Sequence, residues 1–81
     1  MKPEDVGTID DLLKSIELAI EGEMEPSEFA KRLNAEAKGR LAMFGKKMIL
    51  SHFERIVKEY KIPEPEKVCG FAGKVIDQLK G

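Results

Sequence analysis

Two stripes of apolar residues on either side of Lys46 and Lys47 constrain the fold of this 81-residue chain more than any other feature. In both, apolar residues recur every three or four positions, as on one face of an α-helix. The first stripe contains Phe29, Leu33, Ala37, Leu41, Phe44 and Met48, and the second contains Ile49, Phe53, Ile56, Val57 and Tyr60. At 100° per residue, their centres lie about 160° apart around a helix axis. One straight helix can bury both stripes only if it contacts different partners on opposite sides.

Caps and breaks divide the chain into four predicted helices. Thr8 and Asp11 have the spacing of a capping box, with Asp in place of the usual Glu, and Gly22 is suited to a helix end. Prolines 63 and 65 interrupt the helical pattern, because each restricts the residue before it and lacks a backbone N–H. We expect a further break near Gly45, or a bend that begins at Gly39. The predicted helices are 9–21, 27–44, 46–60 and 65–80.

Residues 29–34 resemble the end of the first helix of a helix-turn-helix motif, with Asn34 at the turn. The resemblance ends there, because residues 35–38 are good helix formers and we find no capping residue that opens a second helix. We therefore expect the helix over 27–44 to continue through Asn34.

The composition favours a packed helical domain. Hydrophobic residues make up 42% of the chain and charged residues 36%, and no segment alternates between polar and apolar residues as a strand would. One cysteine cannot form an internal disulfide, and one histidine cannot build a zinc site alone. We expect an all-α fold, a compact four-helix bundle or helical array, that forms one domain over residues 1–81.

The sequence predicts no membrane segment and a cytoplasmic location. The longest apolar run covers residues 41–44, whereas a helix needs about 20 apolar residues to span a bilayer. The N-terminus becomes acidic where a secretory signal would become apolar.

Charge is divided sharply along the chain. Residues 1–28 contain two lysines and nine carboxylates, a net charge of −7, whereas residues 29–61 carry +6 and residues 62–81 balance. Small residues lie among the cations of the second predicted helix. This arrangement would let a phosphate chain approach, or another helix such as the acidic first helix of a neighbouring molecule. The alternative is a solvated charged face.

No pattern in the sequence indicates catalysis, a metal, a cofactor or a small-molecule substrate. Cys69 and His52 lie on different predicted helices, the carboxylates lack a metal-binding pattern, and the glycines do not form a phosphate-binding loop. The predicted helix 65–80 carries a last apolar stripe, which consists of Val68, Phe71, Ala72, Val75, Ile76 and Leu79. Gly70 and Gly73 face away from this stripe, and close contact with another helix would explain them. Leu18 and Leu50 also lie outside the stripes, and together these residues indicate a second buried surface.

We therefore expect a non-catalytic helical interaction module, an adaptor, regulator or inhibitor, that binds a protein partner or self-associates as a homodimer. The alternative function is a nucleic-acid-binding regulator that uses the basic segment 31–47, and a third is a small enzyme or thiol sensor based on Cys69. Steep weakening of binding by salt would distinguish the nucleic-acid function. The predicted contact residues for either kind of partner are Lys31, Arg32, Lys38, Arg40, Lys46 and Lys47.

Overall fold

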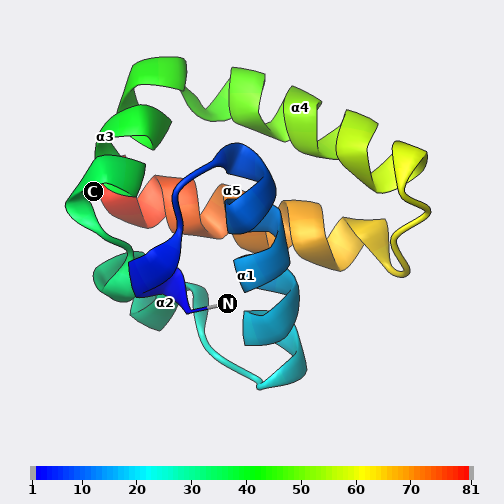
Figure 1. The fold of residues 1–81 in the computed structure, drawn as a ribbon, viewed down its shortest axis with the longest axis horizontal. Helices are drawn as coiled ribbons and strands as arrows, with labels where there is room; N and C mark the ends of the chain where they lie inside the picture. Colours follow the sequence, from blue (N-terminus) through cyan, green and yellow to red (C-terminus); the bar gives the residue numbers. More distant parts are fainter. Residues whose placement is uncertain (1, 81) are drawn as a thin grey trace.

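The computed structural model describes residues 2–80, which form an all-α array without strands (Figure 1). The all-α prediction is therefore confirmed. None of the described helices combines the length and the apolar character needed to cross a bilayer. In chain order the elements are the 3-10 helix η1 (Pro3–Asp5) and the α-helices α1 (Ile9–Glu21), α2 (Pro26–Arg32), α3 (Ala35–Phe44), α4 (Lys46–Glu59) and α5 (Pro65–Lys80).

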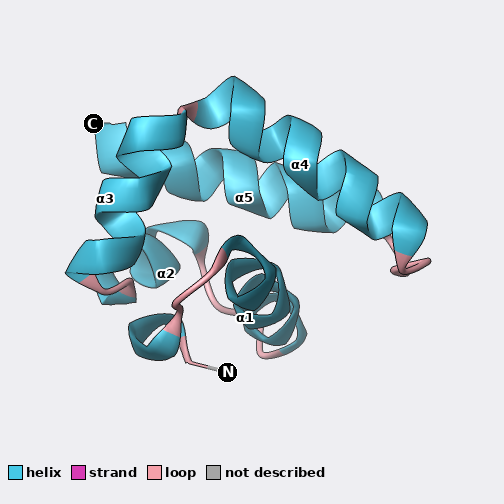
Figure 2. Cartoon of the chain, turned by 45° about the horizontal axis from the view of Figure 1, so that its top comes forward, coloured by secondary structure: helices cyan, strands magenta, loops and turns pink. Residues whose placement is uncertain are grey.

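Helix α5 lies at the centre of the array. It contacts α1, α2, α3 and α4, and α4 runs alongside it (Figure 2). Its apolar face contributes five buried residues, Val68, Phe71, Ala72, Val75 and Ile76, as the spacing of the last stripe predicts. The packing of the array thus depends on this helix.

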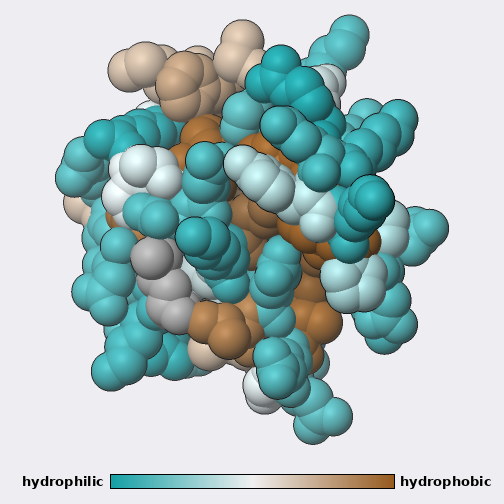
Figure 3. All heavy atoms as spheres, turned by 45° about the vertical axis from the view of Figure 1, so that its right-hand side comes forward, coloured by the Kyte–Doolittle hydropathy of each residue, from teal (hydrophilic) through white to brown (hydrophobic). Residues whose placement is uncertain are grey.

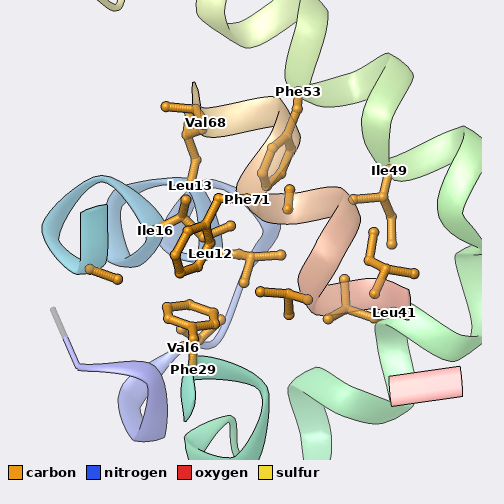
Figure 4. Close-up of a cluster of buried hydrophobic side chains, with 14 of the residues drawn as sticks. Val6, Leu12, Leu13, Ile16, Phe29, Leu41, Ile49, Phe53, Val68 and Phe71 are labelled. Atoms are coloured by element: carbon orange, nitrogen blue, oxygen red, sulfur yellow. The ribbon is translucent and has the colours of Figure 1, made fainter. Parts of the chain in front are cut away.

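Aromatic side chains join the helices in the core (Figure 4). The rings of Phe29 in α2 and Phe71 in α5 meet edge to face, with centroids 5.4 Å apart and an interplanar angle of 88°. Such a contact contributes about 0.5–1.5 kcal/mol beyond the area that it buries. Phe53 of α4 and Ile16 of α1 are also fully buried, so α1, α2, α4 and α5 share one core cluster.

The first predicted helix, 9–21, has the bounds of α1. The Thr8 hydroxyl oxygen accepts a hydrogen bond from the Asp11 backbone N–H at 3.0 Å, as the capping-box spacing predicts. The Asp11 carboxylate accepts from the Gly7 N–H at 3.3 Å. The shorter Asp therefore bonds one residue before the cap, and the predicted start of the helix is correct.

The second predicted helix, 27–44, is wrong as a continuous element, because α2 ends at Arg32 and α3 begins at Ala35. Asn34 causes the break. Its side-chain oxygen accepts from the Ala37 N–H at 2.8 Å and caps α3, while its Nδ2 donates to the carbonyl oxygens of Glu4 at 3.0 Å and Val6 at 2.7 Å. These bonds fix the N-terminal segment against the α2–α3 junction, so tertiary contacts override helix propensity here.

The predicted break near Gly45 is confirmed. Gly45 has a φ of +82°, which favours glycine, and it separates α3 from α4. The predicted helices 46–60 and 65–80 match α4 and α5, apart from residue 60, which follows the last residue of α4.

The glycines and leucines outside the stripes have different environments. Gly73 is buried, and a Cβ at this position would lie 3.7 Å from Lys46 Cε and 4.0 Å from Leu50 Cδ1. Gly73 therefore permits close packing of α4 on α5, and Leu50 packs against the core. Gly70 and Leu18 are exposed. The predicted second surface is thus partly an internal contact.

Replacing Asn34 tests the junction. We expect Asn34→Ala to lower the free energy of unfolding by about 2 kcal/mol, because it removes a helix cap and two hydrogen bonds. Asn34→Ser keeps a capping oxygen but lacks the amide donors, so about half of this loss should remain. Urea denaturation measures both values. If the serine variant is as stable as the wild type, the bonds to residues 4 and 6 do not stabilise the fold.

Replacing Ser15 tests whether a buried hydroxyl destabilises the core. Its hydroxyl is fully buried and, among the described residues, has no hydrogen-bond partner. We expect Ser15→Ala to raise the free energy of unfolding by about 1 kcal/mol, because the desolvated hydroxyl is removed. The exposed Ser51→Ala in α4 is the control for helix propensity. Equal gains in the two variants would contradict this expectation.

Candidate functional site

An exposed apolar surface lies where α3 meets α4, at the upper left of Figure 1. Met43 is 80% exposed, Met48 60% and Phe44 41%. We name these three residues the corner patch. They follow one another around Gly45, so the same turn that separates the helices places all three at the surface. A group of large exposed apolar side chains is typical of an interaction surface.

The prediction that Phe44 and Met48 belong to a buried stripe is wrong. The stripe is buried through Leu41, after which α3 ends and the chain turns. In α4 it is Ile49 that enters the core, and Met48, one residue earlier, lies about 100° around the helix from it. Periodicity indicates a break near Gly45, but it does not show which residues beside the break lose their core contacts.

A hollow of about 210 Å³ adjoins the corner patch. It is lined by Ile9, Phe44, Met48, Ile49 and His52, so α1 supplies one wall and the α3–α4 corner the others. Of these residues, only His52 carries a polar side chain. The hollow therefore provides an apolar recess into which a partner's side chain fits.

Three helices carry the six predicted contact residues. Lys31 and Arg32 lie on α2, Lys38 and Arg40 on α3, and Lys46 and Lys47 on α4. The structure therefore does not place them on one helix face.

Three of these cations form ion pairs within the molecule. Arg32 pairs with Glu4 at 2.9 Å, Arg40 with Glu36 at 2.6 Å and Lys46 with Asp77 at 2.9 Å. All six side chains in these pairs are about 40% exposed or more. Each such pair contributes about 0–1 kcal/mol, so a partner's carboxylate can replace the internal one at little cost.

Cations border the corner patch on both helices. On α3, Arg40 precedes Met43 and Phe44 by three and four residues, so these side chains are neighbours on the helix surface. On α4, Lys47 is exposed beside Met48, and Arg55 donates a hydrogen bond from Nη2 to His52 Nδ1 at 2.9 Å. Arg40 and Lys47 were predicted as contact residues, whereas sequence reasoning missed the corner patch and Arg55.

A second exposed surface, which we name the α1 groove, lies between α1 and the turn from α4 to α5. It consists of two hollows of about 370 and 360 Å³ that share Glu17 and Ile62. Figure 3 shows hydrophobic surface between hydrophilic side chains on the side that bears this turn. The residues that line the groove are Asp10, Leu13, Lys14, Glu17, Ile20, Glu21, Ile56, Tyr60, Ile62, Pro63, Glu64, Lys67 and Val68.

The α1 groove combines an apolar lining with acidic side chains. Four carboxylates line it, those of Asp10, Glu17, Glu21 and Glu64. Two lysines also lie there, and Lys67 pairs with Glu64 at 3.3 Å. The acidic character comes mainly from α1, as the charge division along the sequence predicts.

Cys69 is half-buried in α5. Burial raises the pKa of its thiol, and the carboxylates of Glu54 and Glu66 raise this pKa further. Because the thiolate is the nucleophile, a raised pKa lowers the reactivity of the residue at neutral pH. This environment does not support the thiol-based function.

We expect Cys69 to react more slowly with iodoacetamide in the folded protein than in the unfolded chain, at every pH from about 7 to 9. The pH at which its rate is half-maximal should be higher in the folded protein, because the raised pKa delays formation of the thiolate. Glu54→Gln removes one neighbouring carboxylate and should lower that pH. Faster labelling of the folded protein than of the unfolded chain would contradict a raised thiol pKa at Cys69.

Comparisons with known proteins add nothing to the surfaces described above. A search of protein-family models, curated proteins and solved structures gives no significant match. Within residues 2–80, no three His, Cys, Asp or Glu side chains are grouped so that they could hold a metal ion.

Proposed function

We propose that this chain is a small, non-catalytic helical module that binds another protein through the corner patch. The observation that carries the proposal is the joint exposure of Met43, Phe44 and Met48 beside an apolar hollow. Burying these side chains against a partner removes apolar surface from water, worth about 25 cal/mol per Å². Methionine is flexible and polarizable, so it adapts to the shape of a partner.

The charges around the corner patch favour an acidic partner. Arg40 and Lys47 border it, Arg55 bonds to His52 of the adjoining hollow, and no acidic residue lines that hollow. An amphipathic helix with a carboxylate-rich polar face matches this surface, since its apolar side chains meet the patch and its carboxylates meet the cations. The cations mainly accelerate and orient the encounter, whereas apolar burial supplies most of the affinity.

The nucleic-acid alternative receives less support. Three of the six cations in segment 31–47 are paired with carboxylates of the same molecule. In addition, Met43 and Phe44 expose apolar surface within this segment, whereas phosphate contacts need donors and positive charge. Protein binding therefore accounts for more of the observed surface.

A pair of synthetic peptides tests the proposal. Both carry the same apolar helical face, but one has a glutamate-rich polar face and the other a lysine-rich one. With dilute, isotopically labelled protein, we expect the acidic peptide to perturb backbone amides around residues 40–55 and to bind at least about tenfold more tightly than the basic one, about 1.4 kcal/mol.

Single substitutions locate the binding surface. Met48→Glu should lower the affinity for the acidic peptide at least about tenfold, because it removes apolar contact and adds a repelling charge. The matched control is Leu18→Glu, which changes an exposed leucine on α1 and should leave binding unchanged. Equal affinities for both peptides, or perturbations away from α3 and α4, would contradict the proposal. A salt-sensitive complex with a DNA or RNA duplex would support the alternative.

A further inference from the structure

We propose that the corner patch of one molecule binds the α1 groove of a second copy, so that the chain assembles head to tail. This inference rests on the proposed function and names the partner of the same surface. The α1 groove offers what the corner patch requires, an apolar recess with carboxylates around it. Its two hollows, of about 370 and 360 Å³, are each larger than the hollow beside the patch.

Charge complementarity selects this pairing over a symmetric one. Two corner patches face to face would bring Arg40, Lys47 and Arg55 of both copies together. Two grooves face to face would oppose carboxylates. Only the patch-to-groove contact pairs cations with the acidic side chains that α1 contributes, so a heterologous contact is favoured over an isologous dimer.

The positions of the two surfaces exclude their meeting within one molecule. The corner patch lies at the N-terminal end of α4, whereas Tyr60 in the α1 groove follows its C-terminal end. A helix of 14 residues separates these ends by about 21 Å. Figure 1 shows α4 running from the corner to the turn on the far side. After pairing, one copy therefore keeps a free groove and the other a free patch, so the pair can bind further copies.

The side chains in the contact can be assigned from their chemistry. Met43 and Met48 would enter the apolar floor formed by Leu13, Ile56 and Ile62. The ring of Tyr60, which is 65% exposed, would cover them. Because the corner patch contains only three large apolar side chains, we expect assembly only at concentrations from about 10 µM to 1 mM, with weakening as salt rises.

Mixing two complementary variants tests the proposal. The corner variant carries Met43→Ser and Met48→Ser, which remove apolar contact without adding charge, and the groove variant carries Glu17→Lys and Tyr60→Lys. All four side chains reach solvent, and circular dichroism checks that both variants fold. In sedimentation velocity, we expect the average mass of the wild type to rise with concentration and each variant alone to stay monomeric.

An equimolar mixture of the variants should form 1:1 dimers and nothing larger, because one intact patch and one intact groove remain. The control Ser27→Glu, at an exposed residue of α2 that lines neither surface, should assemble as the wild type does. A wild type that is monomeric at about 1 mM, or a mixture that stays monomeric, would overturn the head-to-tail contact. If the acidic peptide still binds the corner patch in that case, the proposed function stands and only the identity of the partner is wrong.

Discussion

The burial of α5 against four other helices is the constraint on which the structure depends. A chain of 81 residues with one cysteine has no internal disulfide to limit its unfolded state, so apolar packing must supply its stability. Phe71 meets Phe29 of α2 on one side of this helix, and Gly73 lets α4 approach on another. A single helix, α5, thus joins the other four helices in one core.

The corner patch is exposed because of the way in which α3 and α4 both pack on the core. In α3 the apolar stripe is buried through Leu41, and Gly45 then redirects the chain so that Ile49 enters the core from α4. The side chains between Leu41 and Ile49 lie at the turn and do not reach the core. Met43, Phe44 and Met48 remain outside, where cations of α3 and α4 surround them. Fold and proposed function therefore share one determinant, the turn at Gly45.

Much of the fold could be predicted from the sequence because its signals are local. A cap at Thr8 and the prolines at positions 63 and 65 fix helix starts within a few residues of themselves, and these bounds are correct. The break at Asn34 could not be predicted in this way, since its amide bonds to carbonyl groups about 30 positions earlier in the chain. Sequence reasoning also identified the cations but not their ion pairs. It assigned Phe44 to the core because the periodic pattern indicates a break near Gly45 without showing which residues beside it lose their core contacts.

The order of the helices along the chain also has a consequence for synthesis. α5 is translated after the other four helices, yet it covers Phe29, Phe53 and other side chains that are fully buried in the finished molecule. A nascent polypeptide that ends before residue 65 therefore presents these side chains to water or to chaperones. Protection of the earlier helices must therefore wait until α5 has left the ribosome.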